Sequence, residues 1–455
     1  MSESTRTARP LDGLAAMLLR RPGLFTAAAI LLHGALWWLV QIAFSPNLPL
    51  DMIEQLAWGR EWQLVYYKHP PLSAWTLEAL VRLFGNRQEI LFLSGPAFVA
   101  LTMWAVWRLG RRVADPRAAA LAALALTGTI YYGFTSPEFN HNVAQYPFFA
   151  LLPLALHRAM QGDRIADWAL VGLWTALGLY AKYSAALPVV AAGLFLIAHP
   201  RGRAALRRPG PYVAAAIALL VLVPHLYALW QIDFLPFRFP VERAGAAREG
   251  LDHLTNPARF LLAQLLAVLG TLVLVGLTMG RGNAPMASEG TPPESIAEKR
   301  FNRAFVLALG LGPFALALAI DAVTGLRFRS MWGAAFFPLL ALAVFVVRPP
   351  VPTPARGRRF IAMWLLLLGA GLAAFAGKAV LDPWLKGTGS RIHFPGPAVA
   401  AAMAESWRTL APDRPLRIVA GSEWVAGNIA FYGPAQGPQR PSVFIDASRV
   451  KSPWI

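Results

Sequence analysis

The segment 45–88 gathers acidic, basic and aromatic side chains between two long apolar runs. Asp51 follows Pro49 and opens an expected helix over 51–60, on which Glu54 lies one turn further along the same face. A carboxylate at such a place can act as a general base that removes a proton from a hydroxyl nucleophile. Asp51 equally fits an ordinary helix N-terminus, where free amides and the helix dipole would keep it ionised.

Lys68, His69 and the double proline Pro70-Pro71 follow in the same segment and open a second, amphipathic helical stretch over 72–84. A lysine at the depth of the lipid headgroups can bind a phosphate, although it can also be an interfacial residue that only extends its charge toward water. His69 is a candidate contact for a sugar or an acceptor. It can also donate to a phosphate or titrate, and we favour a structural role.

Three further cations are candidates for binding a phosphate. Lys182 interrupts an apolar stretch, where a cation either ends a helix or faces an internal cavity. Arg327 and Arg329 precede another apolar run, and two guanidinium groups offer bidentate recognition of a phosphate. The two arginines equally fit an interfacial belt beside Trp332.

A polar segment, 138–142, precedes another apolar run. Asn140 and Asn142 suit polar contacts to a sugar, or a helix cap, and His141 is a further candidate for such a contact. Glu138 and His141 together supply two metal ligands, whereas a typical site needs at least three. The sequence therefore predicts no metal ligand set and no cofactor, and a divalent metal has only these two side chains in its favour.

Membrane helices must position these side chains. Of 455 residues, 56% are hydrophobic and 15% charged, whereas soluble domains are near a quarter charged. A helix needs about 20 apolar residues to cross a bilayer, and about eleven such runs are expected here. They are 24–44, 88–109, 118–135, 143–160, 166–180, 184–199, 211–231, 259–280, 303–321, 330–347 and 359–379. The fold class is therefore mainly α, a polytopic membrane protein with a long first outer loop that bears amphipathic helices.

The formal charge of +18 lies mostly in arginine clusters between the apolar runs, such as 108–112, 201–208 and 356–359. This pattern indicates cytoplasmic loops against anionic lipid headgroups and argues against nucleic acid. Residues 1–23 are polar and end in Arg20-Arg21, so we expect a cytoplasmic N-terminus and an uncleaved first helix. The chain contains no cysteine, which excludes disulfides, thiolate catalysis and cysteine-based metal sites.

The composition changes after residue 380. The expected elements are a strand over 416–420, a Ser-capped helix over 422–432 with Glu423 in its first turn, and a strand over 442–446. They predict a small α/β unit on the outer face, which suits a lid or an acceptor-binding cap. We therefore expect a transmembrane catalytic domain over 1–380 and a small periplasmic domain over 381–455.

The ordered set of Asp51 and Glu54, followed by the run 67–72 and Trp75, resembles the GT-C superfamily of integral-membrane glycosyltransferases. The nearest branch is that of the bacterial aminoarabinose transferases and the protein O-mannosyltransferases. Many members carry an adjacent Asp-Glu pair in this loop, whereas here Met52 follows Asp51. Further similar segments are 139–142, 178–182, 329–332, 426–432 and 441–444.

This resemblance implies an enzyme that takes a sugar from a polyprenyl-phosphate carrier at the outer face of the bacterial inner membrane. The sugar passes, with inversion, to an acceptor on lipid A or lipopolysaccharide, on a glycan or on a protein. The resemblance makes Asp51 the catalytic base and Glu54 the second acid. It implies that Lys68 binds the carrier phosphate, with Lys182 and Arg329 as further candidates for this role.

Two other functions compete with this one. A lipid or sugar transporter or flippase would favour charges in mid-span and repeated halves with matching broken helices, and the sequence shows few of the former and no clear repeat. In a scaffold subunit, Asp51 and Lys68 would pair only to hold the loop. The loop chemistry favours the transferase.

Overall fold

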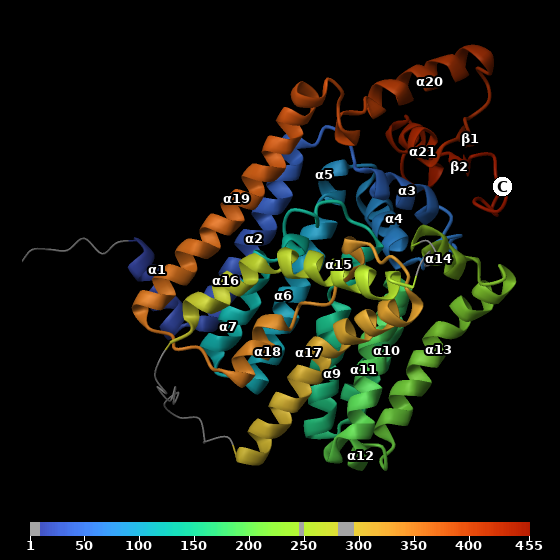
Figure 1. Ribbon diagram of the computed structural model, residues 1–455. Coiled ribbons are helices and arrows are strands. Elements are labelled where there is room, and N and C mark those ends of the chain that lie inside the picture. Colours follow the sequence, from blue (N-terminus) through green and yellow to red (C-terminus); the bar gives the residue numbers. More distant parts are fainter. Residues whose placement is uncertain (1–9, 245–249, 281–294) are drawn as a thin grey trace, which may run out of the picture.

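The computed structural model describes residues 10–244, 250–280 and 295–455. In these residues a bundle of helices carries a smaller unit of two strands and two helices at one end (Figure 1). The prediction of a mainly helical membrane protein is confirmed.

Among the described residues, five segments are long and apolar enough to cross a bilayer, and a bent pair of helices makes a sixth. The five segments are α2 (Pro22–Phe44), α5 with α6 (Gln88–Leu91 and Ser94–Val113), α13 (Gly210–Gln231), α17 (Ile296–Thr324) and α19 (Pro354–Lys386). The pair is α15 (Asp252–Ala267) with α16 (Leu269–Thr278), which meet at 53°. By this criterion the described chain has fewer spans than the eleven that hydropathy predicts.

The remaining predicted spans are shorter or interrupted. Their helices are α7 (Pro116–Ala125), α8 (His141–Gln145), α9 (Phe148–Gly162), α10 (Ile165–Ala181), α11 (Ala186–Ala198) and α18 (Leu340–Val347), and the short helix α12 (Pro200–Ala205) follows α11 in a loop between predicted runs. The run 118–135, for example, leaves the α-helical form after Ala125 and continues as 3₁₀ turns. Residues 118–125 are all buried by protein, so neighbouring segments rather than lipid surround the break, and irregular backbone is tolerated there.

An additional helix, α1 (Pro10–Arg20), lies in the segment 1–23, which the sequence predicts to be a polar, cytoplasmic N-terminus. It packs against α19 beside the start of α2 (Figure 1). Asp12 of α1 pairs with Arg358 of α19 at 2.8 Å. Because α1 has an apolar face and a basic end, it is typical of a helix that lies at a membrane surface.

The first outer loop forms the two helices that its pattern predicts, α3 (Leu50–Gly59) and α4 (Leu72–Phe84). The two helices cross at Gly59, where a β-carbon would overlap the carbonyl oxygen of Ala74. Only a glycine allows this approach, which brings the Asp51 end of α3 and the turn before α4 into one compact structure.

The chain ends in a parallel β-α-β arrangement. Strands β1 (Ile418–Gly421) and β2 (Ser442–Ile445) pair in parallel, and α21 (Glu423–Tyr432) connects them, as parallel strands require a crossover connection. Helix α20 (Gly396–Leu410) packs on α21. The short helix α14 (Arg238–Ala244) completes the described elements of the outer side. These strands and α21 overlap the predicted ones, while the proposed domain boundary at 380 falls inside α19, which continues to Lys386.

This C-terminal unit, residues 387–455, docks on α3 and α4 (Figure 1) through a shared apolar cluster and through polar contacts. Arg440 forms an ion pair with Glu78 of α4, and the two side chains are only 2% and 0% exposed. Arg60 donates to the carbonyl oxygen of Arg440 and, at 2.8 Å, to the hydroxyl of Ser442. Glu78 also pairs with Arg82 at 3.0 Å, whereas the buried Arg440 has Glu78 as the charged partner in its ion pair.

Replacing Glu78 by Gln should loosen this docking, since the buried Arg440 guanidinium would lose its charged partner. Loss of one member of a buried pair costs about 3–5 kcal/mol, so we expect a lower unfolding temperature and faster proteolysis within 387–455. The double variant Glu78→Leu/Arg440→Met should recover most of this loss. The control is Glu405→Gln, which breaks an exposed pair with Arg408. Equal effects of the two Gln variants would contradict the assignment.

Candidate active site

Asp51 lies in the first turn of α3 and is oriented by a side chain from a different part of the chain. The Asn140 amide donates a hydrogen bond to Asp51 Oδ2 at 2.8 Å. The amide oxygen of Asn140 accepts from the backbone N–H groups of Asn142 and Val143, and so caps α8. Because its oxygen is fixed by α8, Asn140 presents its nitrogen to Asp51 in one orientation.

A second carboxyl group, Glu138, adjoins Asp51. The backbone N–H of Asp51 donates to Glu138 Oε1 at 3.3 Å. Burial and the neighbouring Asp51 charge raise the pKa of Glu138 to about 7. Burial also raises the pKa of Asp51, against the hydrogen bond from Asn140 and the charge of Lys68. A carboxylate with a raised pKa is a stronger base, so this pair suits proton abstraction.

Lys68 and Glu54 lie together, and a residue of the C-terminal unit joins them. The Lys68 ammonium forms an ion pair with Glu54 and lies 3.6 Å from Glu423 Oε1. Burial raises the pKa of Glu54 well above its usual range, against the Lys68 charge. Glu54, predicted as a second catalytic acid, therefore contacts the candidate phosphate-binding lysine directly.

Three aromatic rings surround the Lys68 ammonium. Its Nζ lies 5.4 Å from the ring centre of Trp58, 5.2 Å from that of Tyr67 and 5.6 Å from that of Phe239. These distances are typical of cation–π contacts, which strengthen where water is excluded. The rings hold the cation at a fixed place at the mouth of the bundle.

The structure brings Lys182 and Asn142 together. Lys182 Nζ donates to Asn142 Oδ1 at 2.5 Å and lies 6.0 Å from the ring centre of Trp332. Burial lowers the pKa of Lys182 to about 7. An anion beside this lysine would stabilise its charged form, so Lys182 can respond to a bound phosphate.

His69 and His141 stack face to face, with ring centres 3.6 Å apart. Burial, followed by the charges of neighbouring residues, lowers the pKa of both imidazoles well below the usual range, so both are neutral. Within the described ranges no group of three histidine, aspartate or glutamate side chains could hold a metal ion.

Two arginines outside the predicted set act on Asp51. Arg327 and Arg329 are exposed, and Arg329 donates to the carbonyl oxygen of Arg243 at 3.3 Å. The charges of Arg243, on α14, and of Arg391 act on Asp51. Sequence reasoning missed both, although arginines in segments assigned to the outer face oppose the positive-inside pattern and so could have signalled them.

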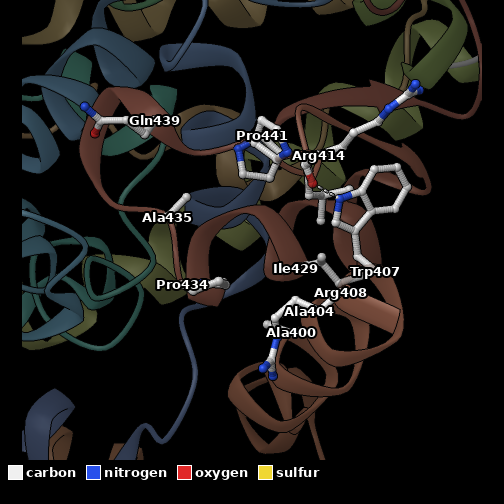
Figure 2. A pocket seen from close by; sticks show the side chains of 13 residues that line it. Ala400, Ala404, Trp407, Arg408, Arg414, Ile429, Pro434, Ala435, Gln439 and Pro441 are labelled. Carbon is white, nitrogen blue, oxygen red and sulfur yellow. Dashed lines mark hydrogen bonds between the residues drawn. The ribbon is translucent and has the colours of Figure 1, made fainter. Parts of the chain in front are cut away.

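A cavity of about 310 Å³ lies in the C-terminal unit, apart from the predicted site residues. Figure 2 shows Trp407 and Ile429 on its wall, with the Trp407 indole N–H donating to the carbonyl oxygen of Arg414 at 2.6 Å. Its wall is formed by α20, α21 and the segments that flank the two strands.

Comparison with known proteins gives one consistent picture. Residues 68–228 match the dolichyl-phosphate-mannose-protein mannosyltransferase family. The lipopolysaccharide core galacturonosyltransferase RgtB of Rhizobium johnstonii is 24% identical over 399 residues, which are 86% of this chain and 77% of RgtB. RgtA, a core galacturonosyltransferase of the same organism, is 25% identical over 443 residues, 94% of this chain and 83% of RgtA.

Among solved structures, ArnT from Cupriavidus metallidurans bound to undecaprenyl phosphate has a similar fold. Its TM-score is 0.53 at 15% sequence identity, over 90% of this chain and 84% of ArnT. The fold is therefore shared along nearly the whole chain.

The raised pKa of Glu138 predicts a stability difference that depends on pH. Its value is 4.5 ordinarily and about 7 in the folded protein, so folding favours the neutral acid. The stability that the neutral Glu138 carboxyl group contributes is therefore fully present below pH 4.5 and is lost as the pH rises through 7. The unfolding temperature of the wild type should fall relative to Glu138→Gln over that range, by the equivalent of about 3 kcal/mol at most. Parallel curves for the two proteins would contradict the assignment.

Proposed function

We propose that the chain is a membrane glycosyltransferase of the GT-C superfamily, which transfers a sugar from a polyprenyl-phosphate carrier to a saccharide of the cell envelope. The similarity to transferases along most of the chain disfavours the transporter and scaffold alternatives. The proposed acceptor is the core of lipopolysaccharide, because RgtA and RgtB are named for the core.

The observation that carries this proposal is that a candidate base and several cations lie in one site at one end of the helix bundle. Asp51 is oriented by Asn140, and the charges of Lys68, Arg243 and Arg391 act on it. A phosphate leaving group needs cations as its bond to the sugar breaks, whereas the acceptor hydroxyl needs a base. A single site supplies both.

In the proposed reaction Asp51 takes the proton of the acceptor hydroxyl, and the hydroxyl oxygen attacks the anomeric carbon. The bond between that carbon and the carrier phosphate oxygen breaks from the opposite side, so the configuration inverts. The bonding electrons pass to the phosphate, whose charge Lys68 and Arg243 stabilise. Glu54 holds Lys68 instead of acting as a second base, since it forms an ion pair with that lysine.

The other candidates take secondary places. Lys182 and Arg329 are further contacts for the carrier phosphate. Asn142, which is hydrogen-bonded to Lys182, and the stacked pair His69 and His141 are candidate contacts for the sugar. The names of the relatives favour galacturonic acid as the sugar. Its carboxylate would suit Arg391, because the proposal assigns Lys68 and Arg243 to the phosphate and leaves Arg391 for a second anionic group. No divalent metal takes part in this proposal.

We place the protein in the bacterial inner membrane, with the N-terminus cytoplasmic and the C-terminal unit periplasmic. The arginine clusters at 108–112 and 356–359 support this orientation, because cytoplasmic loops carry an excess of basic residues. The carrier and the acceptor would then meet at the outer face, where the cluster around Asp51 lies.

Asp51→Asn should abolish transfer and leave expression and folding intact, because the amide cannot accept the acceptor proton. In a deletion strain that carries this variant, mass spectrometry should show an envelope glycan lacking one sugar and accumulation of the polyprenyl-phosphate sugar. Glu89→Gln, at the end of the same loop, is the matched control and should restore the wild-type profile. A fully active Asp51→Asn protein would overturn the mechanism.

Lys68→Ala and Arg243→Ala should each raise KM for the polyprenyl-phosphate sugar by about 10–100-fold, the loss expected for a charged hydrogen bond to phosphate. The assay uses purified protein with donor and acceptor in detergent. Arg87→Ala, which removes an exposed cation of the first outer loop, should leave KM unchanged. Equal KM values in all the proteins would remove these two residues from the donor site.

A further inference from the structure

The C-terminal unit contributes a carboxylate to the cluster around Lys68. Glu423 is the first residue of α21, whose N-terminus Ser422 caps by accepting from the N–H of Val425 at 3.2 Å. Glu423 Oε2 accepts a hydrogen bond from the Tyr67 hydroxyl at 3.1 Å, and Oε1 lies 3.6 Å from Lys68 Nζ. One carboxylate thus contacts two successive residues of the first outer loop.

That loop needs such a contact because its backbone there is irregular. Residues 60–71 link α3 to α4 without a helix or a strand, so the position of Lys68 depends on its side-chain contacts. Glu54 holds the ammonium from α3, and Glu423 holds it from the C-terminal unit. Without the second contact, Lys68 and Tyr67 would sample more conformations.

Glu423 itself is held firmly. Helix α21 lies so close to α3 that a β-carbon at Gly427 would lie 2.6 Å from a methyl carbon of Ile53. At the other end of α21, the Tyr432 hydroxyl donates to Gln88 at 2.8 Å and accepts from the backbone N–H of Leu48 at 2.9 Å. Because α21 is fixed at both ends, Glu423 can hold Tyr67 and Lys68 of the first outer loop in place.

We propose that Glu423 is a positioning residue, which holds Lys68 from the C-terminal unit at the place where this lysine binds the donor phosphate. Docking of the unit then becomes a condition for tight donor binding. The inference rests on the proposed function, in which Lys68 binds the carrier phosphate, and adds to it a residue and a unit outside the transmembrane part.

The charges of the cluster fit this role. Glu54 and Glu423 both contact the Lys68 ammonium, and each affects the pKa of the other. Burial acts to raise the pKa of Glu423, but the hydrogen bond from Glu54 and the charge of Lys68 outweigh it and lower that pKa. The pKa of Glu54 is thus raised and that of Glu423 lowered, although both carboxyl groups adjoin the same ammonium. Lys68 has three N–H donors, so a donor can remain for a phosphate while the carboxyl groups hold the others.

The test compares wild type, Glu423→Ala and Glu423→Asp for binding of undecaprenyl phosphate and for transfer. We expect Glu423→Ala to raise both Kd and the donor KM about tenfold, as for the loss of one charged hydrogen bond, with kcat changed less than twofold. Glu423→Asp keeps the charge and should recover part of the affinity. Glu405→Ala, on the exposed side of α20, is the control and should bind as wild type.

A double variant separates positioning from general stability. Tyr67→Phe removes the second contact of the same carboxylate, so it should weaken binding alone and add little in the Glu423→Ala background. Equal unfolding temperatures for the variants and the wild type exclude loss of fold, and Glu423→Asp carries the test if Glu423→Ala is unstable.

Each outcome of the comparison decides the proposal. Unchanged or tighter binding of undecaprenyl phosphate by folded Glu423→Ala would overturn it, and tighter binding would mean that Glu423 competes with phosphate. Wild-type protein that binds this lipid but transfers no sugar would instead overturn the proposed function. The two failures are therefore distinguishable, since the first appears in the variant and the second in the wild type.

Discussion

The Lys68 ammonium, held between Glu54 and Glu423, is the interaction on which the arrangement of the outer site depends. It joins three parts of the chain: helix α3, the irregular turn before α4, and the C-terminal unit. A charge removed from water is costly unless it is paired, and a broken buried pair is costlier than none. The three parts are thus coupled electrostatically, and a ligand that binds Lys68 acts on all of them. The Glu78–Arg440 pair fixes the same unit from its other side.

Around Asp51 two opposing effects set the chemistry. Burial raises the pKa of the carboxyl group and makes it a better base, while Asn140 and nearby cations stabilise its ionised form. A base needs both effects, since it must be ionised before the reaction and accept a proton during it. Glu138 is buried beside the negative charge of Asp51, and these two effects outweigh the hydrogen bond from the Asp51 N–H and the charges of Arg391 and Lys378, so that its pKa is raised to about 7. Environment therefore assigns different roles to two carboxyl groups that are close neighbours.

Local pattern was enough to predict α3 and α4, because prolines, helix-start signals and apolar spacing all lie within the loop itself. The same pattern brought Asp51 and Lys68 into one candidate site. It could not find Glu423, since the contact joins residues more than 350 positions apart and depends on how α21 packs. Hydropathy also could not predict the number of spans. It predicts one helix over the run 118–135, whereas the helix ends at Ala125, where the surrounding protein buries the chain. Long-range packing thus decides what local sequence leaves open.

The outer arginines give a more general argument. Membrane proteins orient with an excess of basic residues in their cytoplasmic loops, so each arginine on the outer face disfavours the orientation in which it lies. Arg243 and Arg391 nevertheless lie there in the proposed orientation, and their charges act on Asp51. Recognition of anions accounts for these two cations, since in the proposed function Arg243 stabilises the leaving phosphate and Arg391 suits the carboxylate of the sugar. Basic residues in segments that are predicted to face outward, against the positive-inside rule, could therefore have indicated Arg243 and Arg391 as members of this site from the amino-acid sequence alone.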